Sequence, residues 1–330
     1  MFNLGPINGI VPVGNFPCLC SSFKFFTSVN YSCQGQIIDT ISADANFISV
    51  QNNYDDQDRM FINQASGSYS NAVSRFSMGQ NSNTIYQVIL KSYVNAVQPE
   101  IINANHNIRV SVTLDFLQNL IDTNGLVGTP SVAINSVSLL VKMQKLTIPT
   151  INYKLMQLSK IGRYQSLFRT NLTQQYVALA NSTFCSVNLS NFINANIQWT
   201  YFTVRSINAL TRSACFNYIN NVLSFNIINS SNESLTNGTV LANTSLYIIN
   251  KDATRGSYST ESGGSVFYWF HSTNPIQTFT TGIPSSSRLY NGSEQIQIVF
   301  TSALATNYQI DIYGSGVGLF NQTISNVSKL

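Results

Sequence analysis

Charged side chains are scarce in this chain, and this scarcity limits the folds open to it more than any other feature. Of 330 residues, 17 are Lys or Arg and 13 are Asp or Glu, which is 9%, whereas typical soluble domains carry roughly 25%. Polarity comes instead from 40 Asn, 42 Ser and 26 Thr. These residues favour strands and turns, and few Glu and Lys remain for long helices. We therefore predict an all-β fold, with a 12% aromatic content that is ample for a core.

Apolar residues recur at every second position in several short stretches, and this period is typical of half-buried strands. The clearest stretches are 108–116, 137–143, 202–207, 222–228, 246–249, 266–270, 296–300 and 308–312. Turn signals such as Asn237-Gly238 and Asn291-Gly292 separate them. Many short strands divided by turns predict a sandwich or barrel. Short helical turns are expected only near 116–125, 155–161 and 172–180.

Two similar alternating endings, about half a chain apart, predict two successive β domains of the same type. We assign residues 1–20 to an N-terminal arm, 21–150 to the first domain and 151–330 to the second, with the boundary near Pro149 to Arg169. The arm is expected to lie outside both cores, because three prolines and a lack of alternation argue against a regular strand there.

Charge is distributed unevenly along the chain. Residues 123–232 contain no acid and eight bases, whereas the flanking parts are slightly acidic. The bases are Lys142, Lys145, Lys154, Lys160, Arg163, Arg169, Arg205 and Arg212. This asymmetry fits a face turned towards phospholipid head groups or packaged nucleic acid. It equally fits bases scattered over the surface of a charge-poor protein, because they do not form a run.

No catalytic motif is present, and we predict that the chain is not an enzyme and needs no cofactor. The two histidines, His106 and His271, have no carboxylate or cysteine near them in sequence and are expected at loops or strand ends. Asp55, Asp56 and Asp58 form an oxygen-rich cluster that could bind calcium, although a solvated loop tip is the simpler explanation. No specific nucleic-acid site is indicated.

Five cysteines, an odd number without zinc-ligand spacing, indicate buried free thiols and folding in a reducing cytoplasm. Eleven Asn-x-Ser/Thr sequons barely exceed the number of about eight expected by chance from this composition. The run Phe267 to Phe270 is expected to send two rings into the core and two outward, where a neighbouring subunit would cover them.

Taken together, these features resemble the double jelly-roll major capsid proteins of tailless icosahedral viruses. The resemblance rests on Ser138 to Met143, Tyr308 to Tyr313 and the central stretch Trp199 to Ile207. It implies two eight-stranded jelly rolls standing side by side with a few short helices between strands. It also implies homotrimers that form pseudo-hexagonal capsomers of a virion shell, made in the host cytoplasm.

Further expectations follow from the same resemblance. Some of these viruses enclose a lipid membrane, and the Asn- and Ile-rich composition suits an AT-rich genome such as that of a lipid-containing bacteriophage. The base of the capsomer would face that membrane, which makes Lys154, Lys160 and Arg163 the candidates for contact with anionic lipid. Partners would be neighbouring capsomers and the minor capsid or penton proteins.

Three other interpretations remain open on the sequence alone. A secreted β-sandwich adhesin or lectin-like glycoprotein would account for the sequons, but no signal peptide is evident. Another viral β protein, such as a spike, penton or fibre, is a second alternative, although fibres usually carry repeats and none is visible. A β-sandwich hydrolase is the least supported, because His, Asp and Glu are so few.

Overall fold

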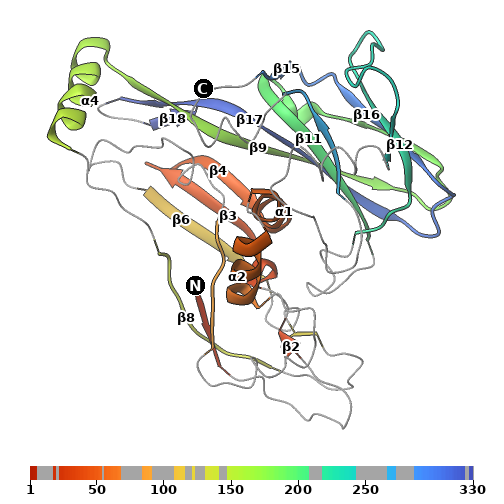
Figure 1. Ribbon diagram of the computed structural model, residues 1–330, viewed down its shortest axis with the longest axis horizontal. Coiled ribbons are helices and arrows are strands. Elements are labelled where there is room, and N and C mark those ends of the chain that lie inside the picture. The colour runs from red at the N-terminus through yellow and green to blue at the C-terminus, as the bar shows by residue number, and fades with distance from the viewer. Residues whose placement is uncertain are drawn as a thin grey trace.

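The computed structural model describes residues 1–5, 18–19, 22–53, 56–67, 84–90, 108–115, 121–122, 131–140, 147–207, 218–242, 266–272, 286–323 and 327–329. Within these ranges, strands up to residue 137 and strands from residue 164 onward share no sheet. We refer to the two parts as the first half and the second half. Helix α4 (Ile148–Ile161) lies between them in sequence (Figure 1).

The second half is a β-sandwich with jelly-roll topology. Its strands are β9 (Tyr164–Ala178), β10 (Phe184–Asn188), β11 (Ala195–Ser206), β12 (Val222–Ile228), β13 (Val240–Leu241), β14 (Phe267–Phe270), β15 (Arg288–Tyr290), β16 (Gln295–Phe300), β17 (Tyr308–Gln322) and β18 (Val327–Lys329), with the 3-10 turn η4 (Ser190–Phe192). One sheet has the order β14-β11-β17-β9, with β15 and β18 at its margins, and the other has the order β10-β16-β12-β13. Successive strands thus cross repeatedly between the two sheets, as a jelly roll requires.

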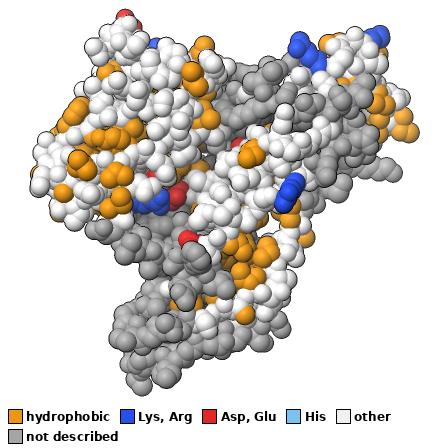
Figure 2. Space-filling model, turned by 180° about the vertical axis from the view of Figure 1, so that it is seen from behind, with side chains coloured by type: hydrophobic (Ala, Val, Ile, Leu, Met, Phe, Trp, Pro, Cys, Tyr) orange, Lys and Arg blue, Asp and Glu red, His pale blue; other side chains and the backbone are white. Residues whose placement is uncertain are grey.

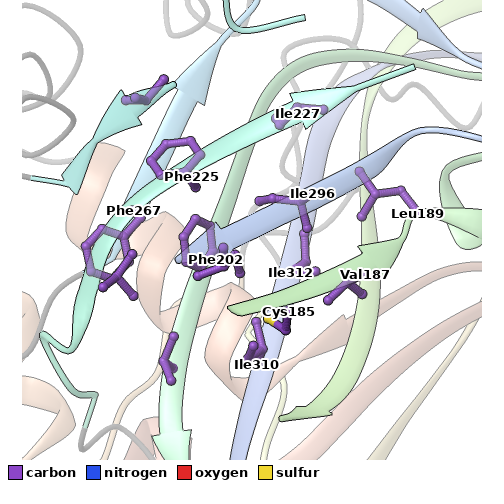
Figure 3. Packing of buried hydrophobic residues seen from close by; sticks show 14 of the residues in the cluster. Cys185, Val187, Leu189, Phe202, Phe225, Ile227, Phe267, Ile296, Ile310 and Ile312 are labelled. Atoms are coloured by element: carbon purple, nitrogen blue, oxygen red, sulfur yellow. The ribbon is translucent and has the colours of Figure 1, made fainter. Parts of the chain in front are cut away.

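The core of the second half lies between these two sheets (Figure 3). Along β16, buried Ile296, Ile298 and Phe300 alternate with half-exposed neighbours. They meet Phe202 of β11, Ile312 of β17 and other inward residues of the opposite sheet. Period-two alternation therefore sorts apolar side chains into the sandwich and polar side chains to its outside.

Strand β17 continues as far as Gln322 because glycines allow a close approach to its neighbour. It pairs with β9 along its whole length, from Tyr308 opposite Ala178 to Gln322 opposite Tyr164. A Cβ at Gly316 would overlap the backbone carbonyl of Asn196 on β11. The Gly-x-Gly-x-Gly sequence at 314–318 is thus a packing feature of a strand.

The first half contains shorter strands in three small sheets. They are β1 (Phe2–Leu4), β2 (Cys18–Leu19), β3 (Phe26–Cys33), β4 (Gln36–Ser42), β5 (Thr84–Tyr86), β6 (Ile108–Leu114), β7 (Ile121–Asp122) and β8 (Ile134–Val137), with the 3-10 turn η1 (Ser22–Lys24). The described pairings give the orders β5-β1-β8, β4-β3-β6 and β2-β7. A second core, which includes Phe25, Phe26 and Val29, joins the larger sheets.

The prediction that the N-terminal segment lies outside both cores is wrong for its first residues. Strand β1 is the middle strand of its sheet, and Phe2 and Leu4 are 3% and 1% exposed. Phe2 packs edge-on against Phe25 at 5.4 Å between ring centroids. Two apolar residues separated by one polar residue are sufficient for a short buried strand, and the prolines that motivated the prediction follow it.

The helices differ in part from expectation. Helix α4 confirms the helical prediction near 155–161 but begins earlier, at Ile148, with Pro149 in its first turn. Gly162 caps its C-terminal end, and the positive φ of 74° there suits a glycine. Residues 172–178 belong to β9, so the helix predicted there is wrong; fifteen paired residues on β17 outweigh local propensity. Helices α1 (Ala43–Asn53) and α2 (Asp56–Ser66) were not predicted. The helix expected near 116–125 and the strand at 246–249 fall mainly outside the described residues.

None of the helices in the described part of the chain is both long and apolar enough to span a membrane.

Candidate functional site

The two halves of the chain meet at a seam formed by helix α1 and the outer face of the β14-β11-β17-β9 sheet. Ala45, Phe47, Ile48 and Val50 on α1 belong to one buried cluster with residues of β11, β14 and β17. Figure 1 shows α1 lying beside this sheet. The described residues of the seam do not form a catalytic arrangement of side chains. Their apolar packing suits a contact that fixes one sandwich against the other.

Aromatic rings fill most of the seam on the side of the second half. Tyr201 of β11 stacks on Tyr313 of β17 and on Tyr268 of β14, with ring centroids 4.9 Å and 5.5 Å apart. Trp199, two residues before Tyr201, is 1% exposed and meets it edge-on. Aromatic pairs contribute beyond their buried area, so the seam is a strong apolar contact.

The aromatic run at 267–270 divides between the core and the seam. Phe267 packs in the core of the second half, where Trp269 also lies, whereas Tyr268 and Phe270 belong to the seam. The predicted alternation of inward and outward rings is thus confirmed. The expectation that a neighbouring subunit covers the outward pair is wrong, because the first half of the same chain covers it.

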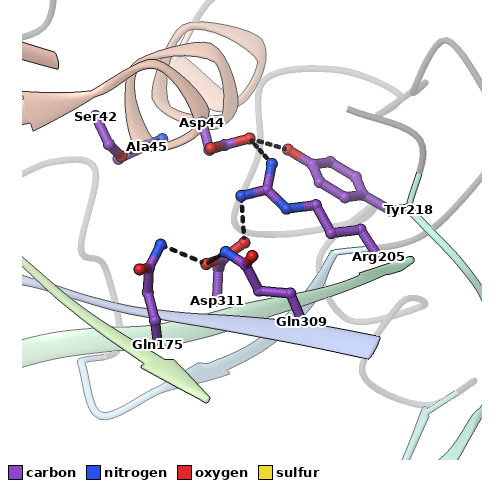
Figure 4. Close-up of polar contacts among 8 residues, drawn as sticks. All are labelled: Ser42, Asp44, Ala45, Gln175, Arg205, Tyr218, Gln309 and Asp311. Carbon is purple, nitrogen blue, oxygen red and sulfur yellow. Dashed lines mark hydrogen bonds and ion pairs between the residues drawn. The ribbon is translucent and has the colours of Figure 1, made fainter. Parts of the chain in front are cut away.

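A buried ion cluster crosses the seam (Figure 4). Arg205 of β11 donates from Nη1 to Asp44 Oδ1 of α1 at 3.1 Å, and its Nη2 forms an ion pair with Asp311 Oδ2 of β17 at 2.9 Å. The three side chains are 13%, 9% and 1% exposed. One guanidinium thus connects a carboxylate from each half of the chain.

Amide and hydroxyl groups complete this cluster. Gln175 of β9 and Gln309 of β17 each donate through Nε2 to Asp311 Oδ1, at 2.9 Å and 2.7 Å. The Tyr218 hydroxyl donates a long hydrogen bond of 3.5 Å to Asp44 Oδ1. Asp311 therefore accepts two hydrogen bonds at Oδ1, whereas its Oδ2 is stabilised by the ion pair with Arg205.

Burial and charge oppose each other in this cluster. Burial favours the neutral form of Arg205, but the carboxylates of Asp44 and Asp311 raise its pKa above its ordinary value. For Asp311, burial and then the repulsion of Asp44 raise the pKa, although Arg205 and the two glutamine amides oppose this change. The guanidinium therefore opposes the rise in the pKa of Asp311 that burial causes.

A second polar group lies on the same sheet, at the end of β14. His271 Nε2 is 2.7 Å from the Tyr290 hydroxyl, which lies 3.1 Å from Thr200 Oγ1. Burial, and then the charge of Arg288, lowers the pKa of His271 to about 4. The imidazole is thus neutral at physiological pH, and its position just after a strand matches the sequence expectation.

The residues predicted to face a membrane are not equivalent in the structure. Lys154 is 3% exposed on α4, and burial lowers the pKa of its ammonium group. The expectation that it contacts lipid is therefore wrong: its helix turns it to the same side as buried Leu158. Lys160 and Arg163 are exposed at the end of the helix and just beyond it.

The calcium prediction stays a prediction. Asp55 lies outside the described residues, Asp56 begins α2, and Asp58 is exposed on that helix. Across the described residues, no group of three or more His, Cys, Asp or Glu side chains is placed to hold a metal ion. The cysteine prediction is confirmed for Cys33 and Cys185, which are buried free thiols. Burial raises the pKa of the Cys185 thiol to about 12.

Sequence reasoning missed Asp44 and Asp311 and counted Arg205 only among the bases of the acid-free stretch. A signal was present in the sequence. Asp311 stands between Ile310 and Ile312, and Arg205 directly follows Val204. A charge inside an apolar strand of a chain with so few charges predicts a buried partner.

The surface of the described residues outside the seam is largely neutral. Figure 2 shows few charged side chains over the described surface seen from behind, and hydrophobic side chains gathered in patches. Several large apolar residues are at least half exposed. Apolar surface of this extent is typical of proteins that assemble.

Comparison with solved structures shows the fold of the whole chain. VP54 of PBCV-1, fitted into a reconstruction of the virophage Sputnik, superposes with a TM-score of 0.62 at 9% sequence identity, covering 100% of this chain and 97% of that one. For the Faustovirus major capsid protein the TM-score is 0.67 at 9% identity, covering 92% and 73%. For the Sputnik virophage structure it is 0.57 at 9% identity, covering 99% and 80%.

The sequence matches no protein-family model and no curated protein. The structural likeness nevertheless spans both halves and the helix between them. It confirms the all-β class and the predicted arrangement of two successive sandwiches in one chain.

Proposed function

We propose that this chain, which has the fold of solved viral major capsid proteins over its whole length, is itself a major capsid protein. It assembles as pseudo-hexagonal homotrimers into an icosahedral shell, and its place is in the virion. The observation that carries this proposal is the superposition of both sandwiches at once, with 100% of this chain and 97% of the PBCV-1 protein aligned. A likeness of one sandwich alone would fit many functions, because sandwiches serve as scaffolds for unrelated activities.

The seam supports the proposal from within the chain. A shell subunit built of two sandwiches needs a fixed angle between them, since many copies must meet neighbours at the same geometry. The stacked rings of Tyr201, Tyr268 and Tyr313 and the ion cluster around Arg205 provide such a fixed contact. Because the two carboxylates come from different halves of the chain, the ion cluster can form only when the halves meet in this orientation.

The composition also suits a shell protein and favours it over the secreted glycoprotein. Charged residues are depleted in the cores of interfaces, and neutral polar groups can hydrogen-bond there without the desolvation penalty of ions. The buried free thiols of Cys33 and Cys185 agree with folding in a reducing cytoplasm. No catalytic role is proposed for any residue.

The oligomeric state tests this proposal. Native mass spectrometry of the purified protein at micromolar concentration should give a mass of about 110 kDa, that of three 36.5 kDa chains. Electron microscopy of the concentrated protein, with the partner minor or penton proteins where these are known, should show closed shells. A stable monomer under all these conditions would contradict the proposal.

We extend the proposal to an anionic membrane beneath the shell, and α4 supports this extension. Ile148 and Leu155 on this helix are 73% and 51% exposed. Lys160 and Arg163 add positive charge, and no Asp or Glu lies between residues 123 and 232 to neutralise it. Exposed apolar and basic residues together are typical of a helix that lies on an anionic lipid surface.

Vesicle binding tests this extension. Each base near an anionic surface contributes about 1 kcal/mol, so Lys160→Gln with Arg163→Gln should weaken binding to phosphatidylglycerol vesicles about 30-fold. Binding to neutral phosphatidylcholine vesicles should not change. Arg109→Gln, at an exposed base on β6, is the matched control and should have little effect. Equal binding of the double variant and wild type would remove the electrostatic argument.

A further inference from the structure

Two Asn-Gly pairs stand in turns of the second half, and they differ in what surrounds them. Asn291-Gly292 joins β15 to β16, and Asn237-Gly238 precedes β13. The asparagine of each pair is exposed, so water reaches both side chains. In such a pair the glycine nitrogen can attack the side-chain carbonyl of the asparagine, because glycine has no Cβ to hinder the approach. The surroundings of each pair therefore decide how readily it reacts.

A buried carboxylate holds the attacking nitrogen of the first pair. Glu294 is 4% exposed, and its Oε2 accepts a hydrogen bond from the Gly292 N–H at 2.9 Å. The Asn291 N–H is shared between the two carboxylate oxygens, each at 3.1 Å. Leu189 fixes this residue further, because its N–H donates to the Glu294 carbonyl at 2.8 Å. A carboxylate in this place can act as a general base for the proton that the Gly292 nitrogen loses as it attacks.

Two donors hold the carbonyl that would be attacked. The Ser293 N–H donates to Asn291 Oδ1 at 2.9 Å, and the Ser293 hydroxyl donates to the same oxygen. This arrangement is an Asx turn, which bends the side chain back towards its own main chain. Donors on a carbonyl oxygen stabilise the negative charge that develops there when a nucleophile adds to the carbon. The turn thus offers a base at one reacting atom and an oxyanion site at the other.

We propose that the turn at residues 291–294 promotes the deamidation of its own asparagine. The Gly292 nitrogen forms a bond to Asn291 Cγ and passes its proton to the Glu294 carboxylate. The bond between Cγ and Nδ2 then breaks, and Nδ2 takes up this proton and leaves as ammonia. Water opens the resulting succinimide ring and leaves aspartate or isoaspartate at position 291. Each chain reacts once, with solvent water as the only co-reactant, and turns over no external substrate.

The product should loosen the turn in which it forms. It places a new carboxylate close to buried Glu294, and like charges at short range repel each other. Isoaspartate also lengthens the main chain of a turn that packs tightly, since a Cβ at Gly292 would come within 3.1 Å of Ile193. The reaction needs only the folded chain, so it stands apart from the proposed function.

Asn237-Gly238 is the matched control within the same chain. The Gly238 N–H donates to the Ser234 hydroxyl at 2.7 Å, and a hydroxyl is a far weaker base than a carboxylate. Within the described part of the chain, no group donates a hydrogen bond to the Asn237 side chain. Folding should therefore slow the reaction at Asn237 by fixing its turn, whereas it should accelerate the reaction at Asn291.

Deamidation rates in the folded and the guanidinium-unfolded protein test the proposal. Both samples are kept in heavy-oxygen water at neutral pH, and peptide mass spectrometry measures the heavy oxygen incorporated at each asparagine. At Asn291 the folded chain should react about 10-fold faster or more than the unfolded chain. At Asn237 the folded chain should react more slowly than the unfolded chain. An Asn291 that reacts in the folded chain no faster than in the unfolded chain would overturn the proposal.

Glu294→Gln tests the role of the base directly. The variant keeps an oxygen that can accept from the N–H groups of the turn, but it should lower the folded-state rate at Asn291 about 10-fold or more. Glu233→Gln, at an exposed glutamate in another turn, is the matched control and should leave this rate unchanged. A variant that folds loosely can at most approach the rate of the unfolded chain, so poor folding does not imitate the wild-type rate. A wild-type rate in Glu294→Gln would overturn the assignment of Glu294 as the base.

Discussion

Replacing Arg205 with methionine tests whether the seam depends on charge neutralisation. Methionine fills much of the volume of the arginine stem but supplies no charge. Asp311, whose side chain is 1% exposed, would then keep only the amides of Gln175 and Gln309. Removing one partner of a buried ion pair typically costs about 3–5 kcal/mol, because the remaining charge is left without compensation. We expect the free energy of unfolding at pH 7 to fall by this amount.

A neutral version of the cluster provides the control. Arg205→Met with Asp44→Asn and Asp311→Asn removes all three charges, and the new amide oxygens can still accept from Gln175 and Tyr218. Neutral replacements of buried ion clusters are often harmless, so the triple variant should lie within about 1 kcal/mol of wild type. Since burial raises the pKa of Asp311, the single variant should also recover part of its loss as the pH falls and this carboxyl takes up a proton.

Urea unfolding followed by tryptophan fluorescence measures these differences. Trp199 lies in the seam and Trp269 packs against the core of the second half, so the two tryptophans of the chain report on both regions. Protein concentration must be held constant, because assembly adds to the apparent stability. A loss below about 1 kcal/mol for the single variant, or equal losses for the single and triple variants, would refute the reasoning.

Three further predictions follow from other parts of the fold. Because the pKa of His271 is about 4 in the folded chain and about 6.5 when unfolded, the unfolded state takes up the proton first as pH falls. The free energy of unfolding should therefore fall by about 3 kcal/mol between pH 6.5 and 4. The variant His271→Gln should lose less stability over this pH range. A variant with the same pH dependence as wild type would contradict the assignment of this loss to His271. Gly316→Ala should lower the unfolding free energy by about 3 kcal/mol or more, because its Cβ would overlap the backbone of Asn196. Gly162→Ala, at the open end of α4, should cost only about 1 kcal/mol, and equal losses for the two variants would contradict the packing argument. Leu4→Ala should cost about 2–5 kcal/mol in thermal or urea unfolding, whereas a cost near zero would restore the view of this segment as a detached arm.

The fold class could be predicted from the sequence because period-two alternation is a local signal. The stretch 222–228 was predicted as a strand and is β12, and the alternation at 296–300 is the buried pattern of β16. The length of β9 could not be predicted in this way. Its partner β17 lies more than a hundred residues later, and the register of fifteen pairs overrides a locally helical segment at 172–180.

The seam was harder to predict, because its parts come from distant elements. The contact between α1 and β11 leaves no mark that a single window of sequence can show, although Ser42 caps the start of α1 by accepting from the Ala45 N–H. The run at 267–270 indicated which rings point outward, but only the folded chain shows that its own first half covers them. The exposure of Lys154 was likewise misjudged, because burial on a helix depends on which side packs.

The shape of the assembled particle tests the central claim most directly. Class averages from cryo-electron microscopy of the purified protein should show a threefold particle with six lobes in a ring, two from each chain. Separate two-lobed particles, or twofold dimers, would contradict the account if they persist at protein concentrations above which the particle mass no longer changes.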